Sequence, residues 1–309
     1  MRAIEADAVV RYTDAAGLPD ALSGADILFV YDFLSTAVPG AWHAADRLRW
    51  LHIASAGVDP VLFPGLRESD VVLTNSRGVF DGAIAEYVLG VILAFAKGFA
   101  RSLDLQRQSR WLHRESERVA GREVLVVGTG PIGRAIARLL RAAGMRVSGA
   151  GRRARSGDPD FGVVHGTDEM PGCLSAADYV VAVAPLTEQT KGMFDAAAFA
   201  AMKPSARFVN VGRGELVVTS DLVAALGEGG IAGAALDVFE TEPLPPESPL
   251  WTMENVLVSP HMSGDFAGWR NTLVEVFREN FGRWRAGEPL HNVVDKQLGY
   301  VPSPEVRTG

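Results

Sequence analysis

The chain has 309 residues, of which 48% are apolar, and a formal net charge of −7. This length and apolar content suffice for one large or two ordinary domains with buried cores. The basic residues are scattered, which argues against a dedicated nucleic-acid surface. A single cysteine, Cys173, excludes an intrachain disulfide. We find neither a signal-peptide pattern nor an apolar run long enough for a membrane span, so we expect a cytoplasmic protein without a membrane partner.

The first third of the sequence alternates strand-like runs with segments of helical composition. The strand-like runs occupy residues 8–12, 27–31, 50–54 and 71–74. This alternation predicts a small parallel α/β domain. A long helical segment then extends from about residue 81 to residue 110, with interruptions at Gly90 and Gly98.

Further strand-like runs separated by helical segments predict a doubly wound parallel sheet. These runs occupy residues 124–127, 146–149, 179–183, 207–210, 234–236 and 256–258. After them, residues 271–285 carry apolar side chains at helical spacing, and Gly287-Glu288-Pro289 ends that helix. The predicted fold class is therefore α/β, with two doubly wound parallel-sheet domains.

The first strand of the second sheet leads directly into Gly128-Thr129-Gly130-Pro131-Ile132-Gly133 and a helix. This glycine pattern between a strand and a helix is typical of dinucleotide binding, although a plain packing turn is the alternative. Gly128 permits the tight turn, Gly130 lets the backbone approach a pyrophosphate, and Gly133 allows close helix packing. The residues that we expect to contact the cofactor here are Gly128, Gly130, Pro131, Ile132 and Gly133.

The second strand of this sheet ends in Gly149-Ala150-Gly151-Arg152-Arg153. A site specific for NAD usually places Asp or Glu about 20 residues after the glycine motif, where it accepts hydrogen bonds from the ribose hydroxyls. This sequence has no carboxylate there, and Arg152 and Arg153 could bracket a 2′-phosphate instead. Solvated loop arginines are the alternative. We expect NADP(H) to be preferred, with NAD(H) possible.

Arg213, Glu242 and His261 follow three separate apolar runs. In a parallel α/β sheet such positions collect at the carboxyl edge of the strands. Arg213 suits the binding of a substrate carboxylate and carbonyl, because a guanidinium grips two oxygens together. His261 suits proton transfer, because histidine titrates near neutrality, and Glu242 is the candidate that stabilises the imidazolium. Taken singly, a solvated arginine, a glutamate in a turn and a histidine at a strand end are the alternatives.

Five motifs of this chain occur in the order found in the D-isomer-specific 2-hydroxyacid dehydrogenases. They are Gly128 to Gly133, Pro185-Leu186-Thr187, Asn210 to Gly214, Ala235 to Leu244 and Pro260-His261. The chain resembles this family over nearly its whole length, and Arg213, Glu242 and His261 match the catalytic triad of the family. The resemblance implies an NAD(P)H-dependent enzyme that interconverts a 2-hydroxy acid and a small 2-keto acid, such as glyoxylate or hydroxypyruvate.

The same resemblance implies how the domains and binding residues are arranged. A Rossmann cofactor domain of residues 98–280 would be inserted into a smaller flavodoxin-like substrate domain of residues 1–97 plus 281–309. Ala56, Gly57 and Val58 match a loop that binds the substrate carboxylate through backbone N–H groups, for which a plain turn is the alternative. Asp237 matches the residue that orients the nicotinamide carboxamide, although Asp after a strand is also a common turn former. The further cofactor contacts implied are Pro185, Leu186, Thr187, Val211 and Gly264.

Other functions and partners also bear on this sequence. Trp111 matches a tryptophan that belongs to a dimer arm in some relatives, so we expect a homodimer, with ordinary interface packing as the alternative role for this side chain. An NAD(P)-sensing protein of the corepressor kind and a formate or phosphite dehydrogenase are the other functions considered. Formate enzymes, however, have Gln where this chain has Glu242. No Cys/His cluster has ligand spacing, so we expect no metal.

Overall fold

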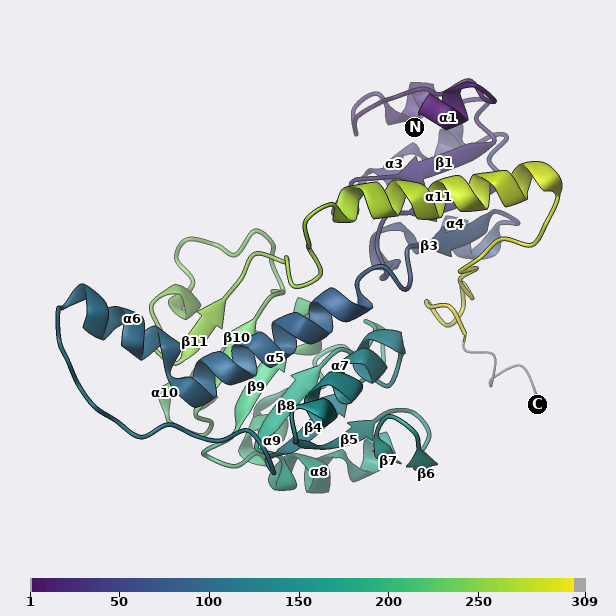
Figure 1. Ribbon diagram of the computed structural model, residues 1–309. Helices are drawn as coiled ribbons and strands as arrows, with labels where there is room; N and C mark the ends of the chain where they lie inside the picture. Colours follow the sequence, from purple (N-terminus) through teal and green to yellow (C-terminus); the bar gives the residue numbers. More distant parts are fainter. Residues whose placement is uncertain (1, 303–309) are drawn as a thin grey trace. The chain divides into compact units, whose positions relative to one another are not determined.

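The protein, described as a computed structural model over residues 2–302, divides into two compact units (Figure 1). The larger unit is the continuous segment Phe80–Asp265, and the smaller unit holds the described residues on either side of it. The larger unit is therefore inserted into the smaller one along the chain.

Both borders between the units differ from those of the expected ranges 1–97 and 98–280. One border lies before the helix of residues 81–97 and not after it, and the other lies before the helix of residues 269–286 and not within it. Helix α5 (Asp81–Lys97) packs along α7 (Pro131–Ala142) of the larger unit. Helix α11 (Trp269–Ala286) places Phe277 and Phe281 in a core of the smaller unit. A helix belongs to the unit in which its apolar face is buried. The sequence shows that a helix has an apolar face, but it does not show which sheet covers that face.

The smaller unit contains a three-stranded parallel sheet in the order β1-β2-β3. Its strands are β1 (Ile27–Val30), β2 (Trp50–Ile53) and β3 (Val72–Asn75). Its helices are α1 (Arg2–Glu5), α2 (Leu18–Leu22), α3 (Ala37–Ala41), α4 (Pro64–Glu68) and α11. Trp50 and Phe277 stack with their ring centroids 5.1 Å apart, which joins the sheet to α11.

The strand expected at residues 8–12 does not form. Val9 in this run is 93% exposed. Val10 packs partly against the core, but no neighbouring strand pairs with this run, and a β-branched residue favours a strand only in such a context. The prediction of a strand at this place was wrong, whereas the three other strands predicted in this part of the chain are confirmed.

The larger unit contains an eight-stranded sheet in the order β11-β10-β9-β8-β4-β5-β7-β6 (Figure 1). The strands that the sequence predicted are β4 (Glu123–Val127), β5 (Arg146–Ala150), β8 (Tyr179–Ala182), β9 (Arg207–Asn210), β10 (Gly233–Leu236) and β11 (Val256–Val258). All of these pair in parallel with their neighbours, as expected. The chain order reverses between β4 and β8, and ligands bind at such switch points in open α/β sheets.

Two strands at the edge of this sheet were not predicted. Strand β7 (Gly162–His165) pairs in parallel with β5 and antiparallel with β6 (Arg155–Asp158). Both strands are short, and β6 consists of the residues Arg-Ser-Gly-Asp, which have no apolar alternation to reveal them.

Helices lie on both faces of this sheet (Figure 1). They are α5, α7, α8 (Met170–Ala176), α9 (Ala196–Ala200) and α10 (Thr219–Gly227), while α6 (Phe99–Arg107) continues the chain from α5. Gly98, with a φ of 60°, ends α5 in the left-handed conformation and begins α6, as the sequence predicted. The second interruption, expected at Gly90, is absent because α5 continues through that residue.

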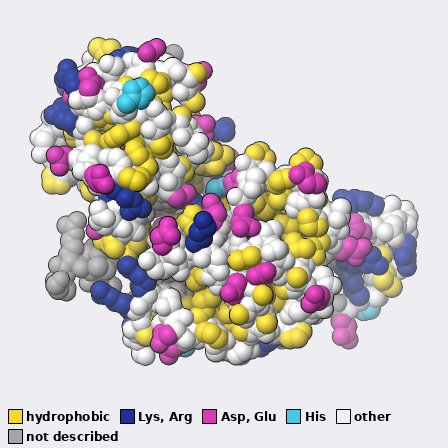
Figure 2. All heavy atoms as spheres, turned by 180° about the vertical axis from the view of Figure 1, so that it is seen from behind, with side chains coloured by type: hydrophobic (Ala, Val, Ile, Leu, Met, Phe, Trp, Pro, Cys, Tyr) yellow, Lys and Arg dark blue, Asp and Glu magenta, His cyan; other side chains and the backbone are white. Residues whose placement is uncertain are grey.

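Two surface properties follow from the described residues. No single helix there is long and apolar enough to cross a membrane, and only the bent pair α5 and α6 passes by length and composition. On the face drawn in Figure 2, acidic and basic side chains are interspersed with apolar ones, and no continuous basic stripe appears among the described residues. A nucleic-acid surface would gather its basic side chains.

Candidate active site

Arg213 lies in the turn after β9, and the last residue of that strand shapes the turn. The Nδ2 of Asn210 donates to the carbonyl oxygen of Arg213 at 2.9 Å, and its Oδ1 accepts from the N–H of Gly212 at 3.1 Å. A Cβ added at Gly214 would overlap the backbone of Phe239 and Glu240. The turn that carries Arg213 therefore abuts the loop that leads to Glu242.

Glu242 and His261 form a directly hydrogen-bonded pair. The Nδ1 of His261 lies 2.7 Å from Oε2 of Glu242, while Oε1 of Glu242 accepts from the N–H of Phe239 at 2.9 Å. Burial by itself raises the pKa of Glu242. The hydrogen bonds from His261 and Phe239, together with the positive charges of His261 and Arg213, outweigh burial and hold this pKa below its ordinary value. The glutamate is thus kept ionised beside the histidine, and Arg213 acts on the same carboxylate.

His261 adopts an uncommon backbone conformation in the loop after β11. Its φ is 51°, in the left-handed region that residues other than glycine rarely adopt. Its N–H donates to the carbonyl oxygen of Asp237 at 2.8 Å and also lies 3.1 Å from that of Ser259. Contacts with the end of β10 therefore fix the direction in which this loop presents the imidazole.

Asp237 is fully buried, and its carboxylate is engaged by the loop that carries His261. Oδ1 accepts from the hydroxyl of Ser259 at 2.6 Å and from the N–H of Met262 at 2.9 Å. Oδ2 accepts from the N–H of Ser263 at 2.9 Å. The family resemblance implies a contact with the nicotinamide, whereas the contacts seen here are to residues 259–263. Sequence reasoning did not consider Ser259 or Tyr87 for any role at this site.

The glycine motif has the geometry of a nucleotide-binding turn. Gly128 has a φ of 119°, and a Cβ there would lie 2.6 Å from the backbone nitrogen of Ala184. A Cβ at Gly133 would overlap the carbonyl oxygen of Gly128, while the space around Gly130 is open within 4 Å. Helix α7 begins at Pro131 without a side-chain cap on its N-terminus. Open space and uncapped N–H groups fit a diphosphate at this point.

The segments after β8 and β9 lie at the same edge of the sheet as the glycine motif. The N–H of Val211 donates to the carbonyl oxygen of Ala182 at 3.1 Å, and the N–H of Thr187 donates to Oγ1 of Thr190 at 2.8 Å. Gly264 packs against Phe80, whose ring carbon would lie 2.9 Å from an added Cβ. Pro185, Leu186, Thr187 and Val211 follow the ends of β8 and β9 directly, so they are available to line a cofactor there.

An ionic network supports the arginine-rich turn after β5. Arg152 and Arg153 are exposed in this turn. Arg155 at the start of β6 donates to Asp158 at 2.8 Å, and Arg134 of α7 makes two further hydrogen bonds of 3.0 Å with the same carboxylate. Burial would raise the pKa of Asp158, but these bonds and two backbone N–H groups hold it well below its usual range. The arginine-rich motif of residues 149–153 did not by itself reveal this network, because Asp158 lies in the hairpin of β6 and β7, which was not predicted.

The loop expected to bind the substrate carboxylate lies in the smaller unit, after β2. Asn75 donates through Nδ2 to the carbonyl oxygen of Ala56 at 2.6 Å, and the hydroxyl of Ser55 donates to that of Gly57 at 2.6 Å. The carbonyl groups of Ala56 and Gly57 thus bind donors of the protein itself. His52, in the preceding strand, is fully buried, and burial lowers its pKa to about 3, so it is a neutral core residue.

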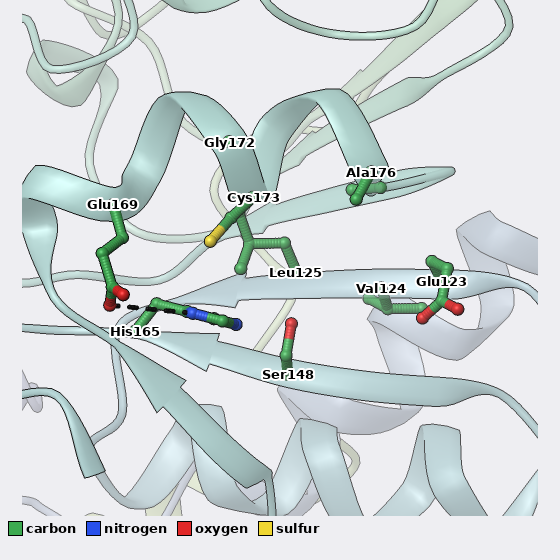
Figure 3. A pocket seen from close by; sticks show the side chains of 10 residues that line it. Glu123, Val124, Leu125, Ser148, His165, Glu169, Gly172, Cys173 and Ala176 are labelled. Carbon is green, nitrogen blue, oxygen red and sulfur yellow. Dashed lines mark ion pairs between the residues drawn. The ribbon is translucent and has the colours of Figure 1, made fainter. Parts of the chain in front are cut away.

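A pocket of about 330 Å³ lies elsewhere in the larger unit, between α8 and the strands β4, β5 and β7 (Figure 3). Ser148, His165 and Cys173 line it, and the Nδ1 of His165 lies 3.7 Å from a carboxylate oxygen of Glu169. Among the described lining residues no nucleophile is hydrogen-bonded to a base. The pocket contains none of the residues expected in the active site, and it lacks the pairing that Glu242 and His261 provide.

A metal centre is not indicated by the described part of the chain. No group of three or more His, Cys, Asp or Glu residues there could hold a metal ion. The polar side chains at the strand edge can bind an anion through Arg213 and exchange a proton through His261, and the carboxylate of Glu242 can stabilise the imidazolium.

Comparison with known proteins identifies several similar chains. The profile of the D-isomer specific 2-hydroxyacid dehydrogenase, NAD binding domain, matches residues 89–263. A glyoxylate reductase of Thermococcus onnurineus is 33% identical over 272 residues, which are 84% of this chain and 80% of that protein. A glyoxylate reductase of Korarchaeum cryptofilum is 32% identical over 271 residues, 85% of this chain and 81% of that protein.

Among solved structures, a D-isomer specific 2-hydroxyacid dehydrogenase family protein from Aeromonas salmonicida has a TM-score of 0.83 and 32% identity, covering 96% of this chain and 94% of its own. The NADPH-dependent glyoxylate/hydroxypyruvate reductase of Sinorhizobium meliloti, in complex with NADP and sulfate, has a TM-score of 0.82 and 32% identity. This similarity covers 93% of the present chain and 90% of the Sinorhizobium meliloti chain.

Proposed function

Because this chain belongs to the D-isomer specific 2-hydroxyacid dehydrogenase family, and is thus an NAD(P)-dependent oxidoreductase, we propose that it reduces a small 2-keto acid such as glyoxylate or hydroxypyruvate with NADPH. The observation that carries the proposal is the 2.7 Å hydrogen bond between His261 and Glu242, with the charge of Arg213 acting on the same carboxylate. These three groups are the ones that such a reduction requires.

The three residues have distinct roles in this proposal. Arg213 binds the substrate carboxylate and polarises the keto oxygen, and it does so best in the transition state, when negative charge develops on that oxygen. An ionised Glu242 can only accept, so Nδ1 of His261 carries a proton toward it and Nε2 exchanges a proton with the substrate. When bound, the nicotinamide supplies the hydride for the carbonyl carbon.

The cofactor would be held by the carboxyl edge of the larger sheet. The turn of Gly128, Gly130 and Gly133 and the uncapped start of α7 bind the diphosphate in this proposal. Arg152 and Arg153 bind the 2′-phosphate, while Asp158 holds Arg155 and supports the hairpin. A cytoplasmic location, where NADPH serves reductions, is part of the proposal.

A second copy of this chain is the partner that we propose. Phe99 and Leu103 of α6 are about half exposed, and the following segment exposes Trp111 completely and Leu112 by 48%. Four large apolar side chains within one short segment favour burial against another surface. Trp111→Ala should weaken the dimer, which light scattering across a dilution series would measure, and a wild type that stays monomeric at high concentration would contradict the proposal.

The function is tested by following NADPH oxidation with glyoxylate, hydroxypyruvate, pyruvate, phenylpyruvate and 2-ketopantoate. We expect turnover with at least one small keto acid and its near loss in His261→Ala, since a general acid contributes about a hundred- to ten-thousandfold. Tight NADPH binding without turnover of any keto acid would instead favour the nucleotide-sensing alternative. Turnover of formate or phosphite with NADP, without turnover of any keto acid, would favour a formate or phosphite dehydrogenase.

A further inference from the structure

The loop of residues 55–58, which follows β2, has its carbonyl groups engaged and its N–H groups open. The carbonyl oxygen of Ser55 accepts from the N–H of Ser76 at 2.8 Å, and that of Ala56 accepts from Nδ2 of Asn75 at 2.6 Å. By contrast, the N–H groups of this loop make no hydrogen bond within the described part of the chain. The loop therefore presents a row of donors that have no acceptor.

The engaged carbonyl groups fix the direction in which these N–H groups point. The carbonyl oxygen of Gly57 is held as well, by the hydroxyl of Ser55 at 2.6 Å. A trans peptide unit is planar, so its carbonyl and its N–H point to opposite sides. With the carbonyls of residues 55–57 turned toward their donors, the N–H groups of residues 56–58 point away from those donors. Successive N–H groups without acceptors form a binding place for an anion.

A buried hydrogen-bond network lies behind the loop, between β2 and β3. Nε1 of Trp50 donates to Oγ1 of Thr74 at 2.7 Å, and this oxygen lies 2.8 Å from Nδ1 of His52. Nε2 of His52 lies 3.3 Å from Oγ of Ser76, which in turn donates to the carbonyl oxygen of Ile53 at 3.3 Å. The four side chains of this network are fully buried, so each polar atom depends on its neighbour in the network for a partner.

The network assigns one tautomer to His52. Thr74 accepts the hydrogen bond of Trp50, and its own hydroxyl hydrogen has no acceptor other than Nδ1 of His52 among the described residues. Nδ1 is then without hydrogen, so Nε2 carries the hydrogen and donates to Ser76. The opposite tautomer would leave the buried hydroxyl of Thr74 without an acceptor, which is costly. Burial lowers the pKa of His52 to about 3, so the ring stays neutral at neutral pH.

We propose that Asn75, Ser76 and His52 are positioning residues for the substrate carboxylate, because they hold the carbonyls of the loop so that its N–H groups stay open to an anion. Asn75 and Ser76 bind the loop directly, and His52 acts through Ser76 by orienting its hydroxyl. This proposal rests on the proposed reduction of a 2-keto acid. Its content is that the affinity for the carboxylate depends on side chains of β2 and β3 that do not touch the substrate.

Asn75→Ala tests the bond to the loop, and Asn280→Ala is its matched control. Asn280 is a buried asparagine of the same unit that also donates to a backbone carbonyl and accepts from a backbone N–H, both of His291. We expect Asn75→Ala to raise KM for glyoxylate by about ten- to hundredfold, the cost of one hydrogen bond to a charged group, with a much smaller change in kcat. Asn280→Ala should leave KM and kcat unchanged, and neither variant should alter the dissociation constant of NADPH.

His52→Gln and His52→Met separate the hydrogen bond of His52 from its packing. Both new side chains are close to histidine in volume, but only glutamine has an amide N–H that can donate to Ser76. His52→Gln should therefore keep KM for glyoxylate closer to the wild-type value than His52→Met does. An equal rise of KM in the two variants would overturn the role of His52.

Two NMR measurements give readouts that do not depend on turnover. Long-range nitrogen–proton correlation of the wild type should show hydrogen on Nε2 of His52 and none on Nδ1, and the reverse pattern would overturn the assigned network. Oxalate, which has carboxylates but no keto group, should shift the amide signals of residues 56–58 in the NADPH complex. Asn75→Ala should need more oxalate for this shift than the wild type, whereas Asn280→Ala should not.

The proposal is overturned if oxalate leaves the amide signals of residues 56–58 unmoved. It is also overturned if Asn75→Ala and Asn280→Ala have the same KM for glyoxylate and the same response to oxalate. If the wild type reduces no keto acid, the proposed function fails, and the oxalate titrations alone decide whether these side chains hold an anion-binding loop.

Discussion

Gly128→Ala tests the turn that begins the cofactor site. Gly128 has a φ of 119°, and a Cβ there would lie 2.6 Å from the nitrogen of Ala184 and 2.7 Å from the carbonyl oxygen of Val183. Both atoms belong to the backbone at the end of a buried strand, so they cannot rotate away. Contacts of a real Cβ lie at 3.0 Å or beyond, so the turn has to move by at least about 0.4 Å.

The cost of this substitution has two parts. The positive φ costs an alanine about 1–2 kcal/mol, and the overpacking costs about 1–3 kcal/mol. We therefore expect the free energy of unfolding to fall by about 2–5 kcal/mol. The displaced turn should also lose at least one charge-assisted hydrogen bond to the diphosphate, which corresponds to about tenfold or more in NADPH affinity.

Two matched glycines separate these contributions. Gly229 has a φ of 71° with nothing within 4 Å of an added Cβ, so Gly229→Ala carries the backbone strain without the overlap. Gly227, at the end of α10, has neither a positive φ nor a close contact. Urea unfolding and NADPH titration of Gly128→Ala, Gly229→Ala and Gly227→Ala should show falling costs in that order, and only the first should weaken NADPH binding. Equal destabilisation by Gly128→Ala and Gly229→Ala, with unchanged NADPH affinity, would refute the reasoning.

The remaining predictions concern single charges of the site. Arg213→Lys should lower kcat as well as raise KM for the keto acid, because an ammonium cannot grip carboxylate and carbonyl together, and normal steady-state reduction would contradict this clamp. The pKa of Glu242 is held below its ordinary value, so its charge persists through neutral pH. Glu242→Gln should therefore remove reduction activity from the alkaline side first, and superimposable pH profiles of wild type and variant would count against the role of Glu242. Arg152→Asp should lower the preference for NADPH over NADH by about tenfold or more in kcat/KM, and an unchanged ratio would show that Arg152 does not bind the 2′-phosphate. Asp158→Asn should lower the free energy of unfolding by about 1–3 kcal/mol at neutral pH. The depressed pKa of Asp158 means that this contribution is lost as the pH falls through the folded-state value, so urea unfolding in acid should show a smaller difference, and an equal one would exclude an ionic origin.

Much of the larger unit could be predicted from the sequence, because strands buried on both faces of a parallel sheet appear as continuous apolar runs. The runs at β4 and β8 to β10 are of this kind, and each of them, like the run at β11, is followed within a few residues by a glycine or a polar residue. Since parallel strands end at the same edge, the order of these runs alone indicated that Arg213, Glu242 and His261 belong to one region. The structure pairs His261 with Glu242 and brings the charge of Arg213 to bear on that glutamate.

The sequence was less informative where an element depends on a neighbour. The run at residues 8–12 has the composition of a strand, but no strand pairs with it, and Val9 is exposed. The hairpin of β6 and β7 was missed for another reason, because the run Arg-Ser-Gly-Asp of β6 favours no strand and the two valines of β7 are too short a run to predict one. Arg134 and Arg155 both donate to Asp158 in this hairpin. Helix α5 was predicted, apart from an interruption at Gly90 that does not form, yet only its packing along α7 decided to which unit it belongs.

The family and the order of the site residues were determined by the sequence itself, because strand periodicity and the glycine turn are local properties of the chain. The partner of each polar side chain was decided only by the tertiary structure. Ser259 lies 22 residues from Asp237 and 172 from Tyr87 in sequence, yet all three are hydrogen-bonded in the fold. A buried carboxylate has to accept hydrogen bonds from donors that the fold brings within about 3 Å. Those donors come from segments far apart in the sequence, so the sequence alone does not reveal the contact.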